Sequence, residues 1–182
     1  MGRCLMNKAI SDLMNDHEVI LTALEVFARI LSKLQNTPLP DENELSQFID
    51  FLVDFADQCH HGKEEGFLFP AMVAFGVPDR GGPIGVMMVE HIQGRGYIHD
   101  LRDALDAEPF DLAGFELAGR KYIDLLRMHI HKENSVLFPM ADKIIPLSDL
   151  DRLCESFSEH EAKFDCDESH VFLANLQSKY PA

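Results

Sequence analysis

Two segments of the chain repeat one pattern of histidine, lysine and glutamate. Residues 60–70 read HHGKEEGFLFP and residues 129–139 read HIHKENSVLFP, at a constant offset of 69 positions. In both segments a histidine precedes a glutamate by four residues. The identical positions are His60/His129, Lys63/Lys132, Glu64/Glu133, Leu68/Leu137, Phe69/Phe138 and Pro70/Pro139.

The four-residue spacing suits metal coordination. Residues i and i+4 project from the same face of a helix, so a histidine and a glutamate at that spacing can reach one site. Each segment also follows a stretch with one further histidine in an apolar stripe, His17 in the first half and His91 in the second. A carboxylate buried in such a stripe costs several kcal/mol unless it is paired or binds a cation. Metal binding by these inward-facing groups is therefore the natural expectation.

The donor types narrow the choice of metal. Imidazole and carboxylate without thiolate suit iron, manganese or zinc. A closed structural zinc site needs only four ligands, whereas six or seven indicate two ions that share bridging carboxylates. Each ligand histidine also needs an acceptor for its other ring nitrogen, for which Asp16, Glu65 and Glu90 are candidates.

Long helices must position these groups. Apolar residues recur at i, i+3, i+4 and i+7 through most of the chain, and strand-like alternation is absent. Asp41 and Glu44 resemble a capping box that opens the second helix, and Pro70 should kink or end it. Pro83 suits the start of the third helix, and Pro146 closes the fourth.

We therefore expect an all-α fold, an up-down-up-down four-helix bundle with an additional C-terminal helix. A single domain should span residues 1–182, with its bundle core at about 8–142 and a C-terminal helical extension at about 148–175. Ser148 or Asp149 could cap that last helix, expected from about 150 to 175.

Composition excludes several classes of protein. The 182 residues carry a formal net charge of −15, which disfavours nucleic acid and anionic membranes as partners. No apolar run approaches the roughly 18 residues of a spanning helix, and the first residues lack the apolar core of a secretory signal. The four cysteines show neither CxxC spacing nor the density of a disulfide framework, so we expect a cytoplasmic protein.

At these motifs the sequence resembles the hemerythrin-like (HHE) cation-binding family over roughly residues 8–142. The joint presence of the motifs in this order makes the resemblance specific. They are Asp16-His17, Cys59 to Glu65 with Leu68 to Pro70, Glu90-His91 with Gly94-Arg95, and His129 to Glu133 with Leu137 to Pro139.

The resemblance implies a non-haem di-iron centre inside the bundle, with an oxo or hydroxo bridge. Glu64 and Glu133 would bridge the two irons. One ion would be bound by His17 and His60, and the other by His61, His91 and His129. The ion at His17 and His60 would keep an open position for O2, NO, peroxide or azide.

Two departures argue against simple reversible oxygen carriage. The third helix offers one inward histidine, His91, because residue 87 is Met and residue 95 is Arg, so His61 would supply the missing imidazole. The second carboxylate is Glu133, at i+4 from its histidine, where oxygen carriers have aspartate.

Alternatives remain at several residues. Each histidine alone could be a satisfied core residue, His61 could be a surface neighbour of a ligand, and Glu65 could replace Glu64 as a bridge. Arg95 could line or gate the site, or lie in solvent. Remaining residues with expected structural roles are Cys59, Met87 and Met88 in the core, and His99, His131, His160 and His170 at the surface or beside the ligands.

The functions in view are O2, NO or redox sensing, iron handling and defence against oxidative or nitrosative stress. An enzyme, either peroxidase-like or catalase-like or one that repairs iron centres, is one alternative. A metal-dependent interaction module is the other.

Overall fold

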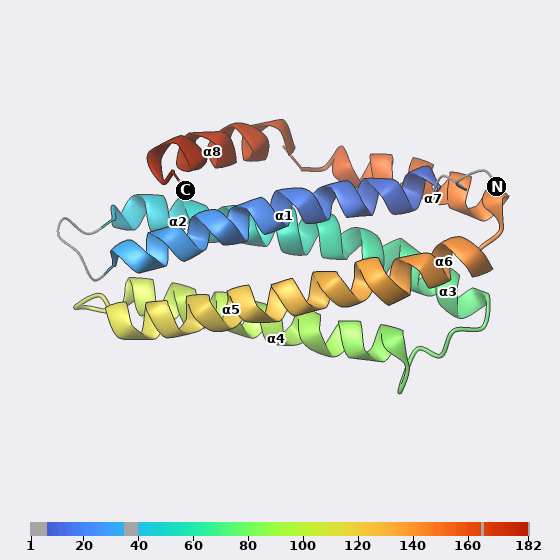
Figure 1. The fold of residues 1–182 in the computed structure, drawn as a ribbon, viewed down its shortest axis with the longest axis horizontal. Coiled ribbons are helices and arrows are strands. Elements are labelled where there is room, and N and C mark those ends of the chain that lie inside the picture. Colours follow the sequence, from blue (N-terminus) through green and yellow to red (C-terminus); the bar gives the residue numbers. More distant parts are fainter. Residues whose placement is uncertain (1–6, 35–39, 165, 182) are drawn as a thin grey trace.

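A computed structural model describes residues 7–34, 40–164 and 166–181, without the side chains of residues 166–170. Within this part of the chain, four long helical segments run antiparallel in chain order, and two further helices lie across them (Figure 1). The predicted all-α four-helix bundle is confirmed.

The four bundle segments follow one another along the chain. The first is α1 (Lys8–Lys33), and the third is α4 (Pro83–Asp106), which begins at the predicted proline. The second is a continuous run of α2 (Glu42–Phe51), the π-helical segments η1 (Leu52–His61) and η2 (Glu64–Leu68), and α3 (Phe69–Ala74). The fourth joins α5 (Leu112–Lys132), the π-helical η3 (Glu133–Leu137) and α6 (Phe138–Ile144).

Side-chain caps begin several of these helices. The Asp41 carboxylate accepts from the Asn43 backbone N–H at 2.9 Å, as predicted. Glu44 does not complete a capping box. Its carboxylate instead accepts from Tyr180 and Lys179 at the end of α8 (Cys166–Lys179), both at 2.5 Å, and this contact holds the end of α8 against the bundle.

Pro70 does not end the second segment, contrary to one of the predicted outcomes, because a wider helical turn precedes it. The backbone N–H of Phe69 donates to Glu64 O, and that of Phe138 donates to Glu133 O. These five-residue steps define the π-helical turns η2 and η3, and the helix continues past each proline. Single π-helical turns of this kind are frequent at functional sites.

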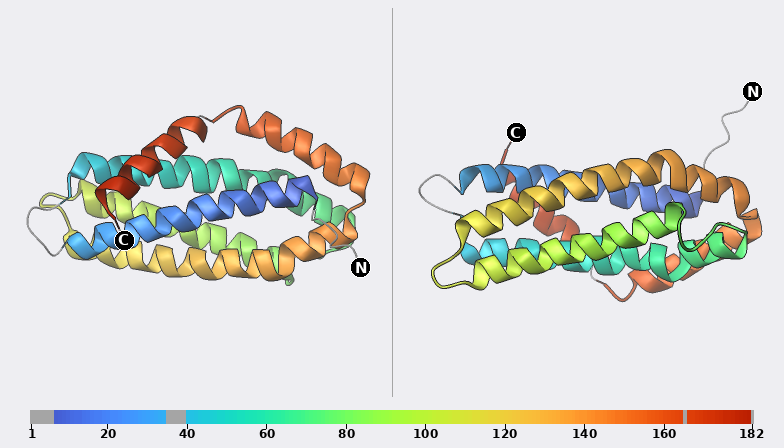
Figure 2. Two further views of the ribbon diagram at one scale, coloured as in Figure 1. Left: turned by 45° about the horizontal axis from the view of Figure 1, so that its top comes forward. Right: turned by 90° about the horizontal axis from the view of Figure 1, so that it is seen from below.

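The C-terminal extension forms two helices where one was predicted, α7 (Leu147–Glu161) and α8 (Cys166–Lys179). Pro146 occupies the N-cap position of α7, and neither Ser148 nor Asp149 caps it. The views in Figure 2 show α7 and α8 lying on the α1 and α2 side of the bundle. The physical reason for two helices is a turn after Glu161, where Ala162 and Lys163 donate back to Ser158 and His160 carbonyls.

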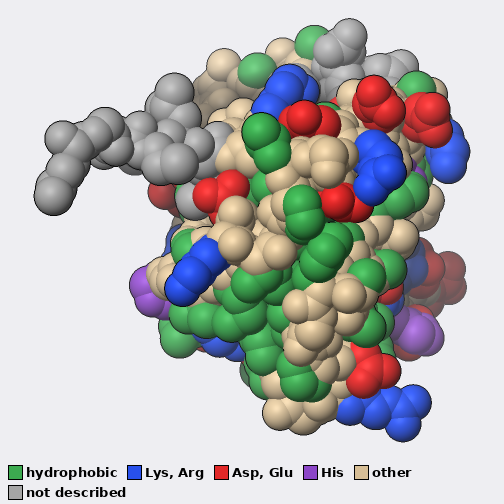
Figure 3. Space-filling model, turned by 90° about the vertical axis from the view of Figure 1, so that its right-hand side faces the viewer, with side chains coloured by type: hydrophobic (Ala, Val, Ile, Leu, Met, Phe, Trp, Pro, Cys, Tyr) green, Lys and Arg blue, Asp and Glu red, His purple; other side chains and the backbone are tan. Residues whose placement is uncertain are grey.

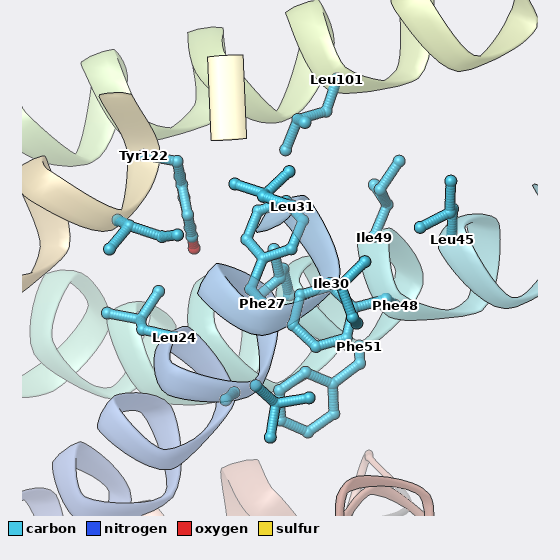
Figure 4. Packing of buried hydrophobic residues seen from close by; sticks show 14 of the residues in the cluster. Leu24, Phe27, Ile30, Leu31, Leu45, Phe48, Ile49, Phe51, Leu101 and Tyr122 are labelled. Carbon is cyan, nitrogen blue, oxygen red and sulfur yellow. The ribbon is translucent and has the colours of Figure 1, made fainter. Parts of the chain in front are cut away.

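Two apolar clusters fill the interior, one toward each end of the bundle. One gathers residues such as Leu24, Phe27, Phe48 and Leu101 (Figure 4), and the other includes Leu13, Leu68 and Leu137. His17 lies between them along α1, so a polar layer separates the two clusters. Figure 3 shows that hydrophobic side chains are also exposed on the end of the molecule that carries α3 and α6. Among the described helices, none is both long and apolar enough to cross a membrane.

Candidate metal centre

Seven side chains meet in this polar layer, and each is at most 4% exposed. They come from all four bundle segments, so the fold brings together residues more than 100 positions apart. The side chains are those of His17, His60, His61, Glu64, His91, His129 and Glu133.

The seven side chains form two overlapping groups. Within each group one potential ligand atom from every residue lies within 4.8 Å of all the others. Glu64 belongs to both groups. One group holds His17, His60, Glu64 and Glu133, and the other holds His61, Glu64, His91 and His129.

Each carboxylate lies between histidines of the two halves. Glu64 Oε1 lies 3.7 Å from His60 Nε2, and Glu64 Oε2 lies 3.5 Å from His91 Nε2. Glu133 Oε2 lies 3.2 Å from the Nε2 atoms of both His17 and His129. This arrangement suits carboxylates that bridge two ions.

Many of these polar atoms make no hydrogen bond of acceptable geometry among the described residues, although Glu133 Oε2 lies near two imidazole nitrogens. They are His17 Nε2, His60 Nε2, His61 Nε2 and both carboxylate oxygens of Glu64 and Glu133. A buried polar group without a partner costs about 1–3 kcal/mol, and more when it is charged. Seven such atoms converging from four helices fit a metal site, because cations would satisfy all of them at once.

The protonation states follow from burial and from the neighbouring charges. Burial and the Glu133 carboxylate hold the pKa of Glu64 well above its usual range. Burial also acts on Glu133, but His129 and His17 hold its pKa well below the usual range. In the metal-free centre Glu64 is therefore the member of the pair that takes up a proton.

The histidines of the centre are mostly held neutral. Burial and His17 lower the pKa of His60 to about 4, and burial and His91 hold that of His61 well below its usual value. Burial lowers the pKa of His91, whereas the Glu133 carboxylate raises that of His129 against the effect of burial. Neutral imidazole is the form that binds metal ions.

Hydrogen bonds to Nδ1 set the direction of each ring. The three predicted acceptors are confirmed: Asp16 holds His60 at 3.0 Å, Glu65 holds His91 at 2.6 Å and Glu90 holds His129 at 3.0 Å. With Nδ1 paired to these carboxylates, Nε2 of each ring faces the interior, where the Nε2 atoms of His91 and His129 lie 3.1 Å apart. Glu65 thus lies outside the seven-residue centre, and Glu64 takes the position between its two halves.

Two acceptors escaped the sequence analysis. Asp57 accepts from His61 Nδ1 at 3.2 Å, and Asn134 Oδ1 accepts from His17 Nδ1 at 2.8 Å. Asp57 precedes His61 by four residues, so the helical spacing applied to the ligands could have found it. Asn134 pairs with a histidine 117 positions away, and no local pattern signals that contact.

Each of the four carboxylates that accept from the histidines also accepts a hydrogen bond from a lysine or an arginine. Lys63 Nζ donates to Asp16 at 2.6 Å, and Lys132 donates to Glu90. Arg95 donates from Nε to Asp57 at 2.9 Å and from Nη2 to Glu65 at 2.8 Å. The Arg95 side chain is 39% exposed, and its guanidinium joins the carboxylates that orient His61 and His91.

A cavity of about 360 Å³ adjoins His61 on the outer side of the centre. Its walls are largely apolar and come from η1, α4 and α5, with Arg95 among the lining residues. The other lining residues that matter here are Val53, Gly94, Ile98 and Tyr122.

The remaining histidines and the sulfur-containing residues lie outside the seven-residue centre. His99 and His131 are exposed, and His160 donates from Nε2 to the Gln58 carbonyl at 2.9 Å. The predicted position of His170 concerns a side chain outside the described residues. Cys59 and Met87 are buried, and Met88 packs against the second apolar cluster.

Comparisons with known proteins agree with this geometry. The sequence profile of the hemerythrin HHE cation-binding domain matches residues 8–141. Uncharacterized proteins from Mycobacterium bovis and from two strains of Mycobacterium tuberculosis are 25% identical over 168 residues, covering 84% of this chain. The match spans only 61% of the length of each relative. No solved structure matches the chain significantly.

Proposed function

Because the chain belongs to the hemerythrin HHE cation-binding family, we propose that its buried centre holds two iron ions that bind or react with O2, NO or peroxide. His17 and His60 would hold one ion, and His61, His91 and His129 the other. Glu64 and Glu133 would bridge the pair.

The observation that carries this proposal is the convergence of buried polar atoms that lack partners in the described structure. Two glutamates within a single apolar interior are costly, and two divalent cations would compensate both carboxylates. Iron, when bound, supplies one-electron redox chemistry and exchangeable coordination of small ligands. Manganese or zinc would fit the same donors.

The residues around the centre would prepare it for this role. The Nδ1 hydrogen bonds keep five imidazoles oriented, and the outer cations hold four of the acceptors in place. The two apolar clusters exclude bulk water from both sides along the bundle. Sensing, iron handling and defence against oxidative or nitrosative stress all need such a protected site.

Small ligands would approach from the cavity beside His61. Its largely apolar walls suit uncharged molecules such as O2, NO and hydrogen peroxide, and the charges on its rim compensate one another. Arg95 pairs with Asp57, Asp103 lies 3.1 Å from His99, and Arg102 pairs at 2.5 Å with Asp50, which lies outside the cavity lining. A cytoplasmic location, inferred from the cysteine spacing, is part of the same proposal.

Elemental analysis of anaerobically purified protein tests the proposal, with optical spectra recorded before and after addition of O2. We expect about two irons per chain and a new charge-transfer band after O2 is added. Two irons without that band would favour NO, peroxide or iron handling. Absence of iron, or a single zinc, would contradict the di-iron centre.

A further inference from the structure

The equivalent lysines of the two repeats differ in solvent exposure. Lys63 and Lys132 occupy equivalent positions, and each binds the carboxylate that orients a histidine of the centre. The Lys132 side chain is 36% exposed, whereas that of Lys63 is 0% exposed. Helix α7 accounts for the difference, because it packs on η2 beside Lys63.

Glu161, at the end of α7, completes the surroundings of the buried ammonium group. Lys63 Nζ lies 2.5 Å from Glu161 Oε1 and 2.6 Å from Asp16 Oδ2, with the Phe157 ring centroid 5.8 Å away. Burial lowers the pKa of Lys63, but the two carboxylates raise it more, so the ammonium stays charged. Asp16 Oδ2 in turn accepts from His60 Nδ1.

A second contact seats α7 against the same turn. The imidazole of His160 covers Gly62, where an added Cβ would lie only 2.7 Å from His160 Nε2. The same nitrogen donates to the Gln58 carbonyl in η1. Phe67 in η2 meets both His160 and Phe157 edge to face. The end of α7 is thus packed directly outside the segment that carries His60 and Glu64.

We infer that Glu161 and Lys63 are positioning residues for His60, and that α7 thereby takes part in retaining the ion held by His17 and His60. Helix α7 lies beyond residues 8–141, the region that matches the family. The inference rests on the proposed function, because it presumes that the centre holds metal. The path from α7 to the ligand runs Glu161, Lys63, Asp16, His60.

The path predicts a selective effect on one of the two ions. Glu161→Gln keeps the size of the side chain but removes the charge that compensates Lys63. Changes to residues that orient metal ligands weaken affinity by about 10–100-fold, so we expect one ion to leave at least about tenfold faster. The other ion, held in the half with Lys132 and Glu90, should leave at the wild-type rate.

The experiment loads the full-length protein anaerobically with iron(II) and follows its release to a coloured chelator. Glu159→Gln is the matched control, since Glu159 is exposed on the same helix. Glu90→Gln should speed the release of the other ion. The double variant Glu161→Gln/Glu90→Gln should therefore retain no slowly released iron. This additivity identifies two separate ions.

Three results would overturn the inference. Glu161→Gln could release iron at the wild-type rate. It could instead release both ions faster and also show a lower free energy of unfolding in urea, as a general loss of stability would. The double variant could also retain one slow ion, which would place both effects on the same ion. A wild-type chain that binds no metal would instead refute the proposed function, and the inference with it.

Gly62 and Gly66 provide an independent test of the contact between α7 and the segment that carries His60. Gly62→Ala would push His160 away, whereas Gly66→Ala meets no described atom within 4 Å. We expect Gly62→Ala to lose one ion faster than the wild type, and Gly66→Ala to lose both ions at the wild-type rate. Because coupling is reciprocal, metal should also slow amide hydrogen exchange in α7 of the wild type, and Glu161→Gln should abolish that protection. Equal exchange with and without metal would contradict the coupling.

Discussion

At the scale of single residues, the centre combines inner donors, carboxylates that orient them and cations that hold the carboxylates. His61 is the donor with the weakest sequence signal, because it adjoins His60 and has no counterpart in the second repeat. The structure places its ring 3.9 Å from that of His91 and hydrogen-bonds its Nδ1 to Asp57. Its uncommitted Nε2 lies in the group with His91 and His129.

His61→Ala should therefore remove most of one ion while the other is retained. The remaining donors of that group, Glu64, His91 and His129, would hold the ion less tightly. Metal content after dialysis against a weak chelator measures the effect. His131→Ala is the control, because His131 is exposed on the neighbouring repeat. Full retention of two ions by His61→Ala would exclude His61 as a ligand.

The metal-free protein should lose stability as the pH falls from 6.5 toward 4. The unfolded chain binds a proton at His60 near pH 6.5, whereas the folded chain binds it only near pH 4. His61 and His91 act in the same direction, whereas His129 and Glu64 oppose them because their pKa values are raised. Urea unfolding at pH 7 and pH 5 measures the difference. A higher free energy of unfolding at pH 5 would contradict the prediction, because the raised pKa values of Glu64 and His129 would then outweigh the lowered pKa values of the other histidines.

At the scale of helices, the bundle offers both the ligands and an approach to them. Helix α4 carries His91 toward the centre and Gly94 one turn further along, where the cavity beside His61 begins. An added Cβ at Gly94 would meet Tyr122, Leu125 and Leu126 at 3.7–3.8 Å, which is ordinary contact. A Cβ therefore fits at this position, and a side chain there would narrow the cavity.

Gly94→Val should slow both the binding and the release of azide at the iron-loaded centre, by about tenfold. The dissociation constant should stay constant, because a narrowed path changes the barrier and leaves the bound and free states unaltered. Stopped-flow absorbance measures the rates. Gly96→Val on the same helix is the control, since no described atom lies within 4 Å of its Cβ position. Unchanged rates in Gly94→Val would place the approach elsewhere, such as beside His17 and His60.

At the scale of the whole molecule, the free energy of metal binding adds to the free energy of folding. The four bundle segments bring buried carboxylates and imidazoles with unsatisfied polar atoms into the same layer, which opposes folding in the absence of cations. The apolar clusters on either side supply the opposing stabilisation.

Removal of the metal should lower Tm by on the order of 10 °C. A ligand present at a thousandfold excess over its Kd stabilises by about 4 kcal/mol, and a domain of this size shifts by about 2–4 °C per kcal/mol. Calorimetry of chelated and reloaded protein measures the change. Equal Tm values in both states would show that the centre folds without need of metal.

The sequence alone was sufficient to predict the helices, the bundle and the inner donors as candidates, because these depend on spacing within one helix. Periodic apolar residues indicate which face is buried, and the 69-residue repeat selects Glu64 over its neighbour Glu65. The π-helical turns before Pro70 and Pro139 were missed, since hydrogen-bond register depends on how each helix is packed.

Contacts between distant segments were decided only by the tertiary structure. The pairing of Asn134 with His17, the bridging of Asp57 and Glu65 by Arg95, and the burial of Lys63 under α7 all join residues far apart in the chain. No periodicity encodes such distances, because they depend on how whole helices are placed against one another. The sequence by itself determined which groups face inward, and the tertiary structure decided which of them meet and what holds each in place.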